Sequence, residues 1–254
     1  LAASTAWWEH GRADRMEPMM DRPEDFDAED AAAAELDALQ GRHQAGELHG
    51  PRELVALLNS TQPSVLCGAA NALYNLALDR GNADVLLPLG ALPKLCGLLE
   101  HDDDTVKAAM AGVLMNACAT SPSCRSELSV TQLLPALLRA IVAASSATAE
   151  PEVRKNALGA LNNLMLDRDA ARSLREEGGI EVLTNLLRAE GASEARLEDA
   201  ASSLLRALQE DNRAGDAFVD VDGLPVLVAV VASPNEELQV RVCGLVSELC
   251  EQVP

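Results

Sequence analysis

The side chains that could carry out acid–base chemistry do not gather at the spacings that such chemistry needs. The carboxylates of Asp102–Asp104 form a charge run, and His101 directly precedes it. A general base needs a positioned partner, and a lone histidine beside acids is more often a surface residue at a helix end. The sequence contains no glycine-rich phosphate loop and no Gly-x-Ser-x-Gly nucleophile elbow. We therefore predict no catalytic residue and no cofactor, and expect a protein that is not an enzyme.

The cysteines are the other candidates for chemistry, and their spacing argues against a metal site. There are six, Cys67, Cys96, Cys118, Cys124, Cys243 and Cys250. None forms a Cys-x-x-Cys pair and the four histidines lie elsewhere, so the clustered ligands of a zinc site are missing. We expect free thiols, with a Cys118–Cys124 disulfide as the less favoured alternative. Free thiols indicate a reducing compartment, either the cytoplasm or an organelle reached after removal of a targeting segment.

Composition and charge exclude further classes of function. Of the 254 residues 48% are hydrophobic but only 2% are aromatic, so the core must be built from Leu, Ala and Val. Twenty basic and 40 acidic side chains give a formal net charge of −20, which repels a phosphate backbone or an anionic membrane. The longest apolar run, 224–232, is too short to span a bilayer. We expect protein partners, without nucleic-acid binding or direct membrane insertion.

An internal repeat indicates which elements position the polar residues. The segment Asn-Leu-Ala-Leu-Asp-Arg at 75–80 recurs at 163–168 as Asn-Leu-Met-Leu-Asp-Arg. The first residue of this segment has five equivalents, at Asn75, Asn116, Asn163, Arg206 and Glu248. Their spacings are 41, 47, 43 and 42 residues. A period of about 40–47 residues is typical of helical armadillo and HEAT repeats.

Each repeat is predicted to contain three helices. In the second repeat we expect them near 82–89, 92–100 and 103–119, with Asp102–Thr105 capping the third. Glycines that precede the second helix are expected to adopt the left-handed conformation that ends a helix, at Gly90, Gly179 and Gly223. A single unit cannot bury its apolar stripe, so the units must stack into an elongated solenoid.

The pattern resembles the armadillo-repeat family, with HEAT-type repeats as the alternative. Its third helices end in Ala-Leu-x-Asn-Leu, which stands here at 72–76 and 160–164. The resemblance implies an all-α fold, a right-handed α-solenoid of about five three-helix repeats, preceded by an acidic arm. We place the arm at 1–50 and the solenoid at 51–254. The predicted units are about 51–80, 81–121, 122–167, 168–211 and 212–254.

In that family the third helices line a concave groove, and the repeated asparagine faces the ligand. An amide has two donors and an acceptor, so it can pair with both polar groups of an extended peptide backbone. Importin-type receptors add a tryptophan four residues earlier, and none stands at those positions here, so import-signal binding by that mechanism is not expected. The candidate groove residues are Asn75, Asn116, Asn163, Asn71, Gly112, Gly159 and Arg206.

Two expectations about these residues follow. If the three asparagines face solvent, replacing them with alanine should leave the melting temperature nearly unchanged. The glycines have two interpretations, either close packing within the repeat or a shallow floor that admits a partner.

The segment 1–50 differs from the rest of the chain. It carries 12 acidic and 4 basic residues, without the repeat, and holds Trp7, Trp8 and Phe26. It is either a disordered acidic tail or an arm that docks through its aromatic residues. For the whole chain we predict an interaction scaffold or adaptor that is part of a hetero-complex. The alternatives are a structural subunit of a large assembly and a nucleotide-exchange co-chaperone of the seventy-kilodalton heat-shock chaperone.

Overall fold

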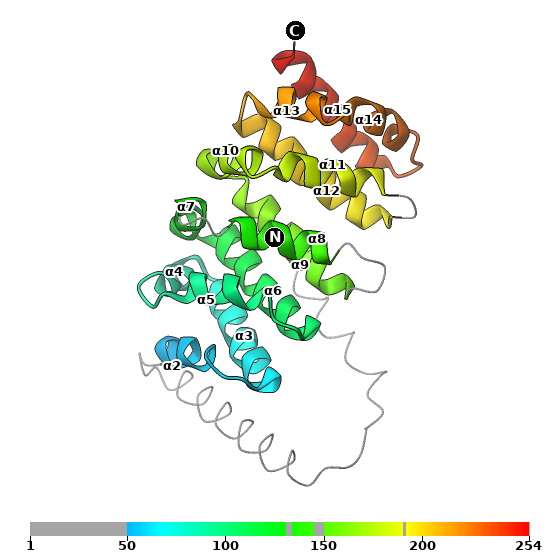
Figure 1. Cartoon of the computed structure of the whole chain (residues 1–254). Helices are drawn as coiled ribbons and strands as arrows, with labels where there is room; N and C mark the ends of the chain where they lie inside the picture. Colours follow the sequence, from blue (N-terminus) through cyan, green and yellow to red (C-terminus); the bar gives the residue numbers. More distant parts are fainter. Residues whose placement is uncertain (1–49, 131–133, 145–149, 190–191, 254) are drawn as a thin grey trace, which may run out of the picture.

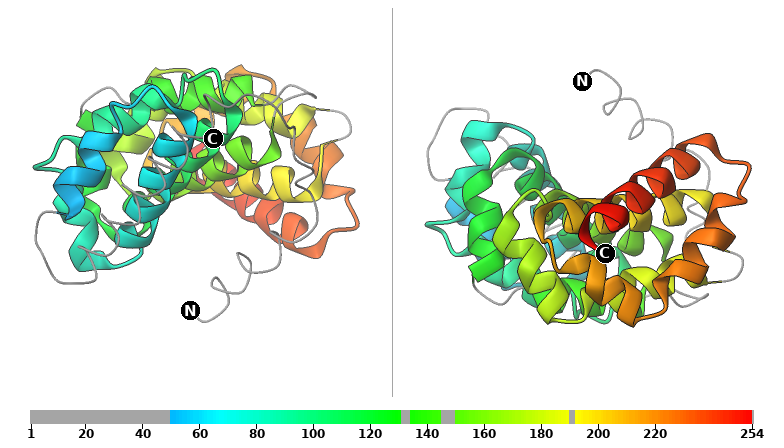
Figure 2. Two further views of the ribbon diagram at one scale, coloured as in Figure 1. Left: turned by 90° about the horizontal axis from the view of Figure 1, so that it is seen from below. Right: turned by 90° about the horizontal axis from the view of Figure 1, so that it is seen from above.

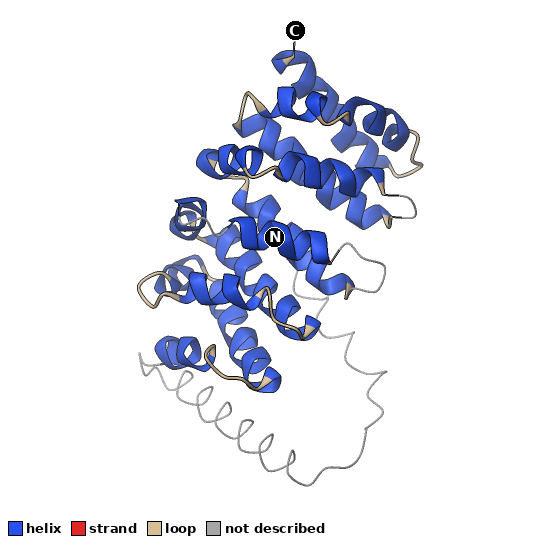
Figure 3. Cartoon of the chain, viewed as in Figure 1, coloured by secondary structure: helices blue, strands red, loops and turns tan. Residues whose placement is uncertain are grey.

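The computed structural model describes residues 50–130, 134–144, 150–189 and 192–253. Every regular element in these ranges is a helix, and none of the ranges contains a strand (Figure 3). The helices form layers that follow one another along the chain from one end of the molecule to the other (Figure 1). The predicted all-α solenoid is therefore confirmed.

Three kinds of helix recur along the stack, and we name them by their order within a unit; the first described unit contains only the second and third kinds. The first helices are α4 (Arg80–Ala83, continued by the 3-10 helix η1, Asp84–Leu86), α7 (Pro122–Val130), α10 (Arg168–Glu176) and α13 (Ala214–Asp220). The second helices are α2 (Gly50–Leu57), α5 (Ala91–Leu98), α8 (Leu134–Ala143), α11 (Gly179–Arg188) and α14 (Gly223–Val231). The third helices are α3 (Pro63–Ala77), α6 (Asp104–Thr120), α9 (Pro151–Leu164), α12 (Glu194–Glu210) and α15 (Glu236–Gln252).

The layers stack with a rotation, so that seen along the stack the helices outline an arc (Figure 2). The third helices lie on the inner side of this arc, and the first helices lie toward its outer side. One continuous core of Leu, Ala, Val and small residues runs through the described units. The near absence of aromatic residues permits this close helix packing, with Phe218 as a fully buried exception.

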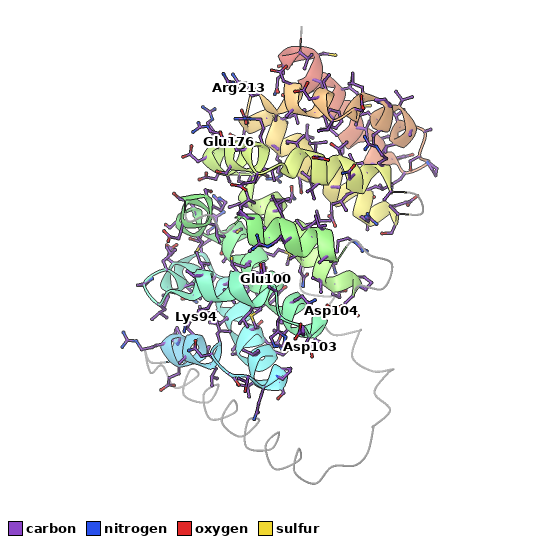
Figure 4. All side chains as sticks on the ribbon, viewed as in Figure 1. Lys94, Glu100, Asp103, Asp104, Glu176 and Arg213 are labelled. Atoms are coloured by element: carbon purple, nitrogen blue, oxygen red, sulfur yellow. The ribbon has the colours of Figure 1, made fainter. Side chains whose placement is uncertain are left out.

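Polar side chains cap the starts of three third helices, α12, α15 and, as predicted, α6. The Asp103 carboxylate accepts the backbone N–H groups of Thr105 at 2.7 Å and Val106 at 3.3 Å (Figure 4). Burial by itself would raise the pKa of Asp103, but these hydrogen bonds outweigh it and hold the pKa below its ordinary value. Asn235 caps α15 in the same way, accepting from the N–H of Leu238 at 3.0 Å.

The glycine prediction is right at one position and wrong at two. Gly90 has a φ of 63°, but the other left-handed residues are Gly178 (φ 75°) and Asp222 (φ 54°), one place before the predicted Gly179 and Gly223. The two wrongly assigned glycines are needed for close approach instead. A Cβ atom on Gly223 would lie 2.4 Å from the ring of Phe218, and one on Gly179 would lie 2.1 Å from Leu174.

The first helix of the second unit is shorter than predicted. It was expected over 82–89, whereas α4 and η1 together end at Leu86. Pro88 explains the difference, because its ring has no N–H and clashes with the carbonyl four residues earlier. The predicted arm, with Trp7, Trp8 and Phe26, lies outside the described residues apart from Gly50, so its docking role stays a prediction.

Candidate functional site

The recurring asparagines lie on the third helices, but their environments differ. Asn75 on α3 is exposed, Asn163 on α9 is half-buried and Asn116 on α6 is only 7% exposed. The expectation that all three face solvent is therefore wrong for Asn116. Its amide is engaged with the preceding third helix, donating to the carbonyl of Tyr74 on α3.

Two of these amides connect neighbouring units through the same hydrogen bond. Asn116 Nδ2 donates to the carbonyl oxygen of Tyr74 at 3.2 Å, and Asn163 Nδ2 donates to that of Met115 at 3.0 Å. Tyr74 and Met115 each directly precede the asparagine equivalent of the previous unit. The amide thus holds one third helix to the next, and its rotamer is fixed by that contact.

Each fixed amide keeps binding capacity after this bond is made. The side chain still has one N–H and the Oδ1 acceptor, and no described residue donates a hydrogen bond to the Oδ1 atoms of Asn116 and Asn163. An acceptor held at a repeated position can receive N–H groups of an extended chain. Their role in partner binding stays a prediction.

The glycines four residues before the asparagines are packed against the preceding unit. A Cβ atom on Gly112 would lie 3.3 Å from the ring of Tyr74, and one on Gly159 would lie 2.6 Å from the sulfur of Met115. These contacts favour the interpretation of close packing, here between units rather than within one. The side chains of Tyr74 and Met115 fill the space above the glycines, where importin-type receptors would have a tryptophan.

Two further polar residues that the sequence prediction missed strengthen the same contacts. Thr120 Oγ1 donates to the carbonyl of Ala77 at 2.8 Å, and Asn156 Nδ2 donates to that of Ala108 at 2.9 Å. Asn156 lies seven residues before Asn163 and hence on the same face of α9, which is the sequence signal that would have found it. Among the described residues, the exposed Asn71 and the half-buried Arg206 make no hydrogen bond of this kind.

Charged residues replace amides on the later third helices. Asp199 on α12 is half-buried, and desolvation raises its pKa with a further contribution from Glu198, while Arg241 and Lys155 act in the opposite direction. Arg196 Nε, on the same helix, is buried without a hydrogen-bond partner among the described residues. The inner surface therefore changes from neutral amides on α3, α6 and α9 to mixed charge on α12 and α15.

The thiols behave as core residues or exposed side chains. All six cysteines are free, as predicted, so the alternative of a Cys118–Cys124 disulfide is wrong. Burial raises the pKa of Cys96 to about 12 and also raises the pKa of Cys118. Such thiols stay protonated and unreactive near neutral pH.

Within the described ranges, no group of three or more His, Cys, Asp or Glu side chains is placed to hold a metal ion.

A shallow hollow between α11, α13 and α14 is lined by Glu181, Asp220 and Pro225, among others. Arg188 occupies part of it, donating to the carbonyls of Val221 and Asp222.

In the part of the chain that is described, no single helix is long and apolar enough to cross a membrane. One bent pair of helical segments, 122–129 and 134–143, meets the length and hydropathy requirements of a membrane span, by length and composition only.

The fold and the third-helix surface define the class of protein, a helical-repeat solenoid with one continuous inner face. Among relatives, Splicing regulator ARVCF of Rattus norvegicus is 36% identical over 107 residues, or 41% of this chain and 10% of that protein. Armadillo repeat-containing protein 3 of Homo sapiens is 30% identical over 137 residues, or 53% of this chain and 15% of that protein. The matched regions thus span a small part of the relatives' own lengths.

Solved structures extend the comparison over most of the chain. The designed armadillo repeat protein YIII(Dq)4CqI superposes with a TM-score of 0.73 at 24% identity, covering 90% of this chain and 96% of its own. A second designed armadillo repeat protein, solved in complex with the peptide (KR)4, has a TM-score of 0.73 at 22% identity, covering 90% and 95%. No protein-family model matches the chain. The chain belongs to the armadillo-repeat superfamily.

Proposed function

We propose that the chain is a non-enzymatic scaffold or adaptor that binds an extended segment of a partner protein along its third helices, within a hetero-complex. The observation that carries this is the repeated geometry of Asn116 and Asn163, in which one N–H of each amide donates to the previous unit and fixes the side chain. In the proposal the Oδ1 acceptors of these amides receive the ligand. Acceptors fixed before binding lose little rotamer freedom when a peptide backbone arrives.

The likeness to a designed protein that was solved with a bound peptide supports this proposal. The inner surface of this chain offers polar side chains at repeated spacing and changes from amides to charges along its length. We therefore expect a segment whose backbone is read by α3, α6 and α9. Its charged side chains are matched by Lys155 at the start of α9, Asp199 on α12 and Arg241 on α15.

Asn75 offers a clean test, because it is exposed and lies in the same repeated position. Peptides are selected from a phage-displayed library on the full chain, and their affinity is measured by calorimetry. Asn75→Ala should weaken a selected peptide by about tenfold, which is the loss of one or two hydrogen bonds, with an unchanged melting temperature.

Asn212→Ala is the matched control, because Asn212 is also exposed but lies in the loop after α12. It should leave the affinity unchanged. Selected peptides that bind both variants as tightly as the original chain would show that the asparagine positions do not form the site.

A further inference from the structure

Arg196 stands at a position that other third helices fill with an apolar core residue. It is the third residue of α12, and the third residues of α6, α9 and α15 are Val106, Val153 and Leu238. Those three side chains are 0%, 2% and 0% exposed. Arg196 is half-buried, and its Nε is buried without a hydrogen-bond partner among the described residues. Because an unpaired charge at the edge of a core costs free energy, an arginine here needs a role that the core does not supply.

A second arginine lies close to Arg196. Desolvation lowers the pKa of Arg196, and the positive charge of Arg154 on α9, in the adjacent layer, lowers it further (Figure 1). Arg154 donates from Nη1 to the carbonyl of Ala144 at 2.8 Å, which holds its guanidinium in place. Among the described residues, neither arginine forms an ion pair. Two positive charges therefore lie together between α9 and α12.

The acidic side chains near the start of α12 are engaged elsewhere. Glu194 and Glu198 lie one turn apart, and both accept from the Asn235 amide, at 3.2 and 2.6 Å, on the side of the helix toward α15. Arg196 follows Glu194 by two residues, which is about 200° around the helix, so it faces away from these carboxylates and toward α9. Asp199 is influenced by cations of α9 and α15 other than this pair. The acids of α12 thus leave the arginine pair available to an anion.

The chemistry of the pair favours a doubly charged anion. A guanidinium binds oxyanions through a planar fork of N–H groups, and both arginines keep N–H groups beyond the one that bonds to Ala144. A carboxylate neutralises one of the two charges, whereas a phosphate monoester near neutral pH carries almost two and has three acceptor oxygens. The net charge of −20 repels a free anion at long range, so the phosphoryl group needs the further contacts of a peptide that carries it.

We infer that Arg154 and Arg196 bind the phosphoryl group of a phosphorylated serine or threonine in the partner protein. The inference rests on the proposed function, because the rest of the partner segment is held by the third-helix asparagines. Nine residues of α9 separate Arg154 from Asn163, which is about 14 Å along the helix. About four residues of extended chain span that distance, so the phosphorylated residue lies about four places from the one that Asn163 contacts.

An array of paired synthetic peptides tests the inference on the full chain. The members of a pair share their flanking residues and carry either phosphoserine or serine at the centre. In the pairs that bind most tightly, phosphoserine should strengthen binding by about tenfold, measured by fluorescence anisotropy. Arg196→Met should remove this gain and leave the chain folded, because the equivalent positions hold apolar residues. Arg172→Met is the matched control and should keep the gain, because Arg172 is exposed on α10 and pairs with Asp169.

Asn75→Ala separates this inference from the proposed function. It should weaken both members of a pair alike, whereas Arg196→Met should weaken only the phosphorylated member. An array without any preference for phosphoserine would overturn the inference, even where Asn75→Ala weakens binding and so supports the proposed function. A preference that needs Arg196 but not Asn75 would support the anion site and contradict the asparagine surface.

Three other outcomes would assign the arginine pair to a different anion. Thermal stabilisation by inorganic phosphate, lost in Arg196→Met, would assign it to free phosphate if the peptides show no preference. Equal binding of a peptide with glutamate in place of phosphoserine would show that a single negative charge suffices. A phosphoserine preference that appears only after Glu190→Gln would assign the pair to that carboxylate of the same chain. Each of these results would overturn the inference as stated.

Discussion

The third helices of the first three units and those of the last two are joined by different chemistry. Between α3, α6 and α9, neutral amide and hydroxyl groups such as Asn116 and Thr120 donate to backbone carbonyls. Between α12 and α15, the amides of Asn235 and Gln209 donate to the carboxylates of Glu194, Glu198 and Glu248, and one amide, that of Gln252, donates to a backbone carbonyl, that of Leu208. Neutral bonds are nearly indifferent to salt and pH, whereas contacts with carboxylates depend on both.

Two buried polar atoms at the junction of the two regions lack hydrogen-bond partners among the described residues. They are Asn162 Oδ1 on α9 and Arg196 Nε on α12. Arg206 stands where an asparagine would continue the amide series, so the series ends at Asn163. A buried polar group without a partner costs free energy, and the amide region therefore ends where its contacts are no longer made.

The largest expected effect is in the charged region, at the ion pair between Arg175 on α10 and Asp211 after α12. Arg175 Nε lies 2.6 Å from Asp211 Oδ2, and the Asp211 side chain is only 7% exposed. Arg175→Met leaves a buried carboxylate without its cation, which should lower the free energy of unfolding by about 3 kcal/mol in urea denaturation. Arg172→Met on the same helix removes an exposed pair with Asp169 and should cost about 0.5 kcal/mol or less. Equal losses for the two variants would contradict the assigned role of burial.

The second effect tests the amide region. Asn116→Ala removes a buried amide and leaves the Tyr74 carbonyl without its donor, so it should cost about 1–3 kcal/mol. Asn75→Ala, at the equivalent but exposed position, should cost about 0.5 kcal/mol or less. Thermal unfolding of the two variants measures the difference. Adding salt should leave the Asn116→Ala loss unchanged, and a strong salt dependence would show that the amide bond is not what was lost.

The third effect is the pH dependence of folding stability that the buried thiol of Cys96, in the first region, is expected to cause. Burial raises the pKa of Cys96 from 9.0 to about 12, so above about pH 9 the unfolded chain releases the thiol proton and the folded chain keeps it. Stability is complete below pH 9 and falls as pH rises, by about 1 kcal/mol for this thiol at pH 10. Cys96→Ala should flatten the decline in stability between about pH 8 and 10. The exposed Cys243 is the control, because Cys243→Ala should leave the decline as it is.

The smallest effect concerns an ion pair between units that is open to water. Arg139 on α8 contacts Glu100 after α5, and their side chains are 62% and 56% exposed. Arg139→Met should change the free energy of unfolding by about 0.5 kcal/mol or less, and added salt should abolish even that. A loss as large as that of Arg175→Met would mean that exposed ion pairs stabilise the contacts between units as much as buried ones. That result would contradict the assigned role of burial.

The repeat period, the helical content and the capping of α6 by Asp103 were all predictable from the sequence. These features depend on contacts within a few residues along the chain, or on a period that appears directly in the sequence. The sequence prediction was wrong where a glycine can be required for either of two reasons, a positive φ or the close approach of another side chain. Gly178 and Gly179 are adjacent, and only the packing of Leu174 shows which one needs positive φ and which one needs to lack a Cβ atom.

The sequence by itself determined a stack of armadillo units with an amide at a repeated place. Only the tertiary structure decided what that amide does, because the Asn116 hydrogen bond reaches Tyr74, 42 residues away, and depends on how one unit is rotated against the next. The same holds for the exposed fraction of an apolar side chain. Val246 of α15 stands where α6 has Leu114, yet Leu114 is 1% exposed and Val246 is 45% exposed, because a pattern along one helix cannot report whether another helix covers it.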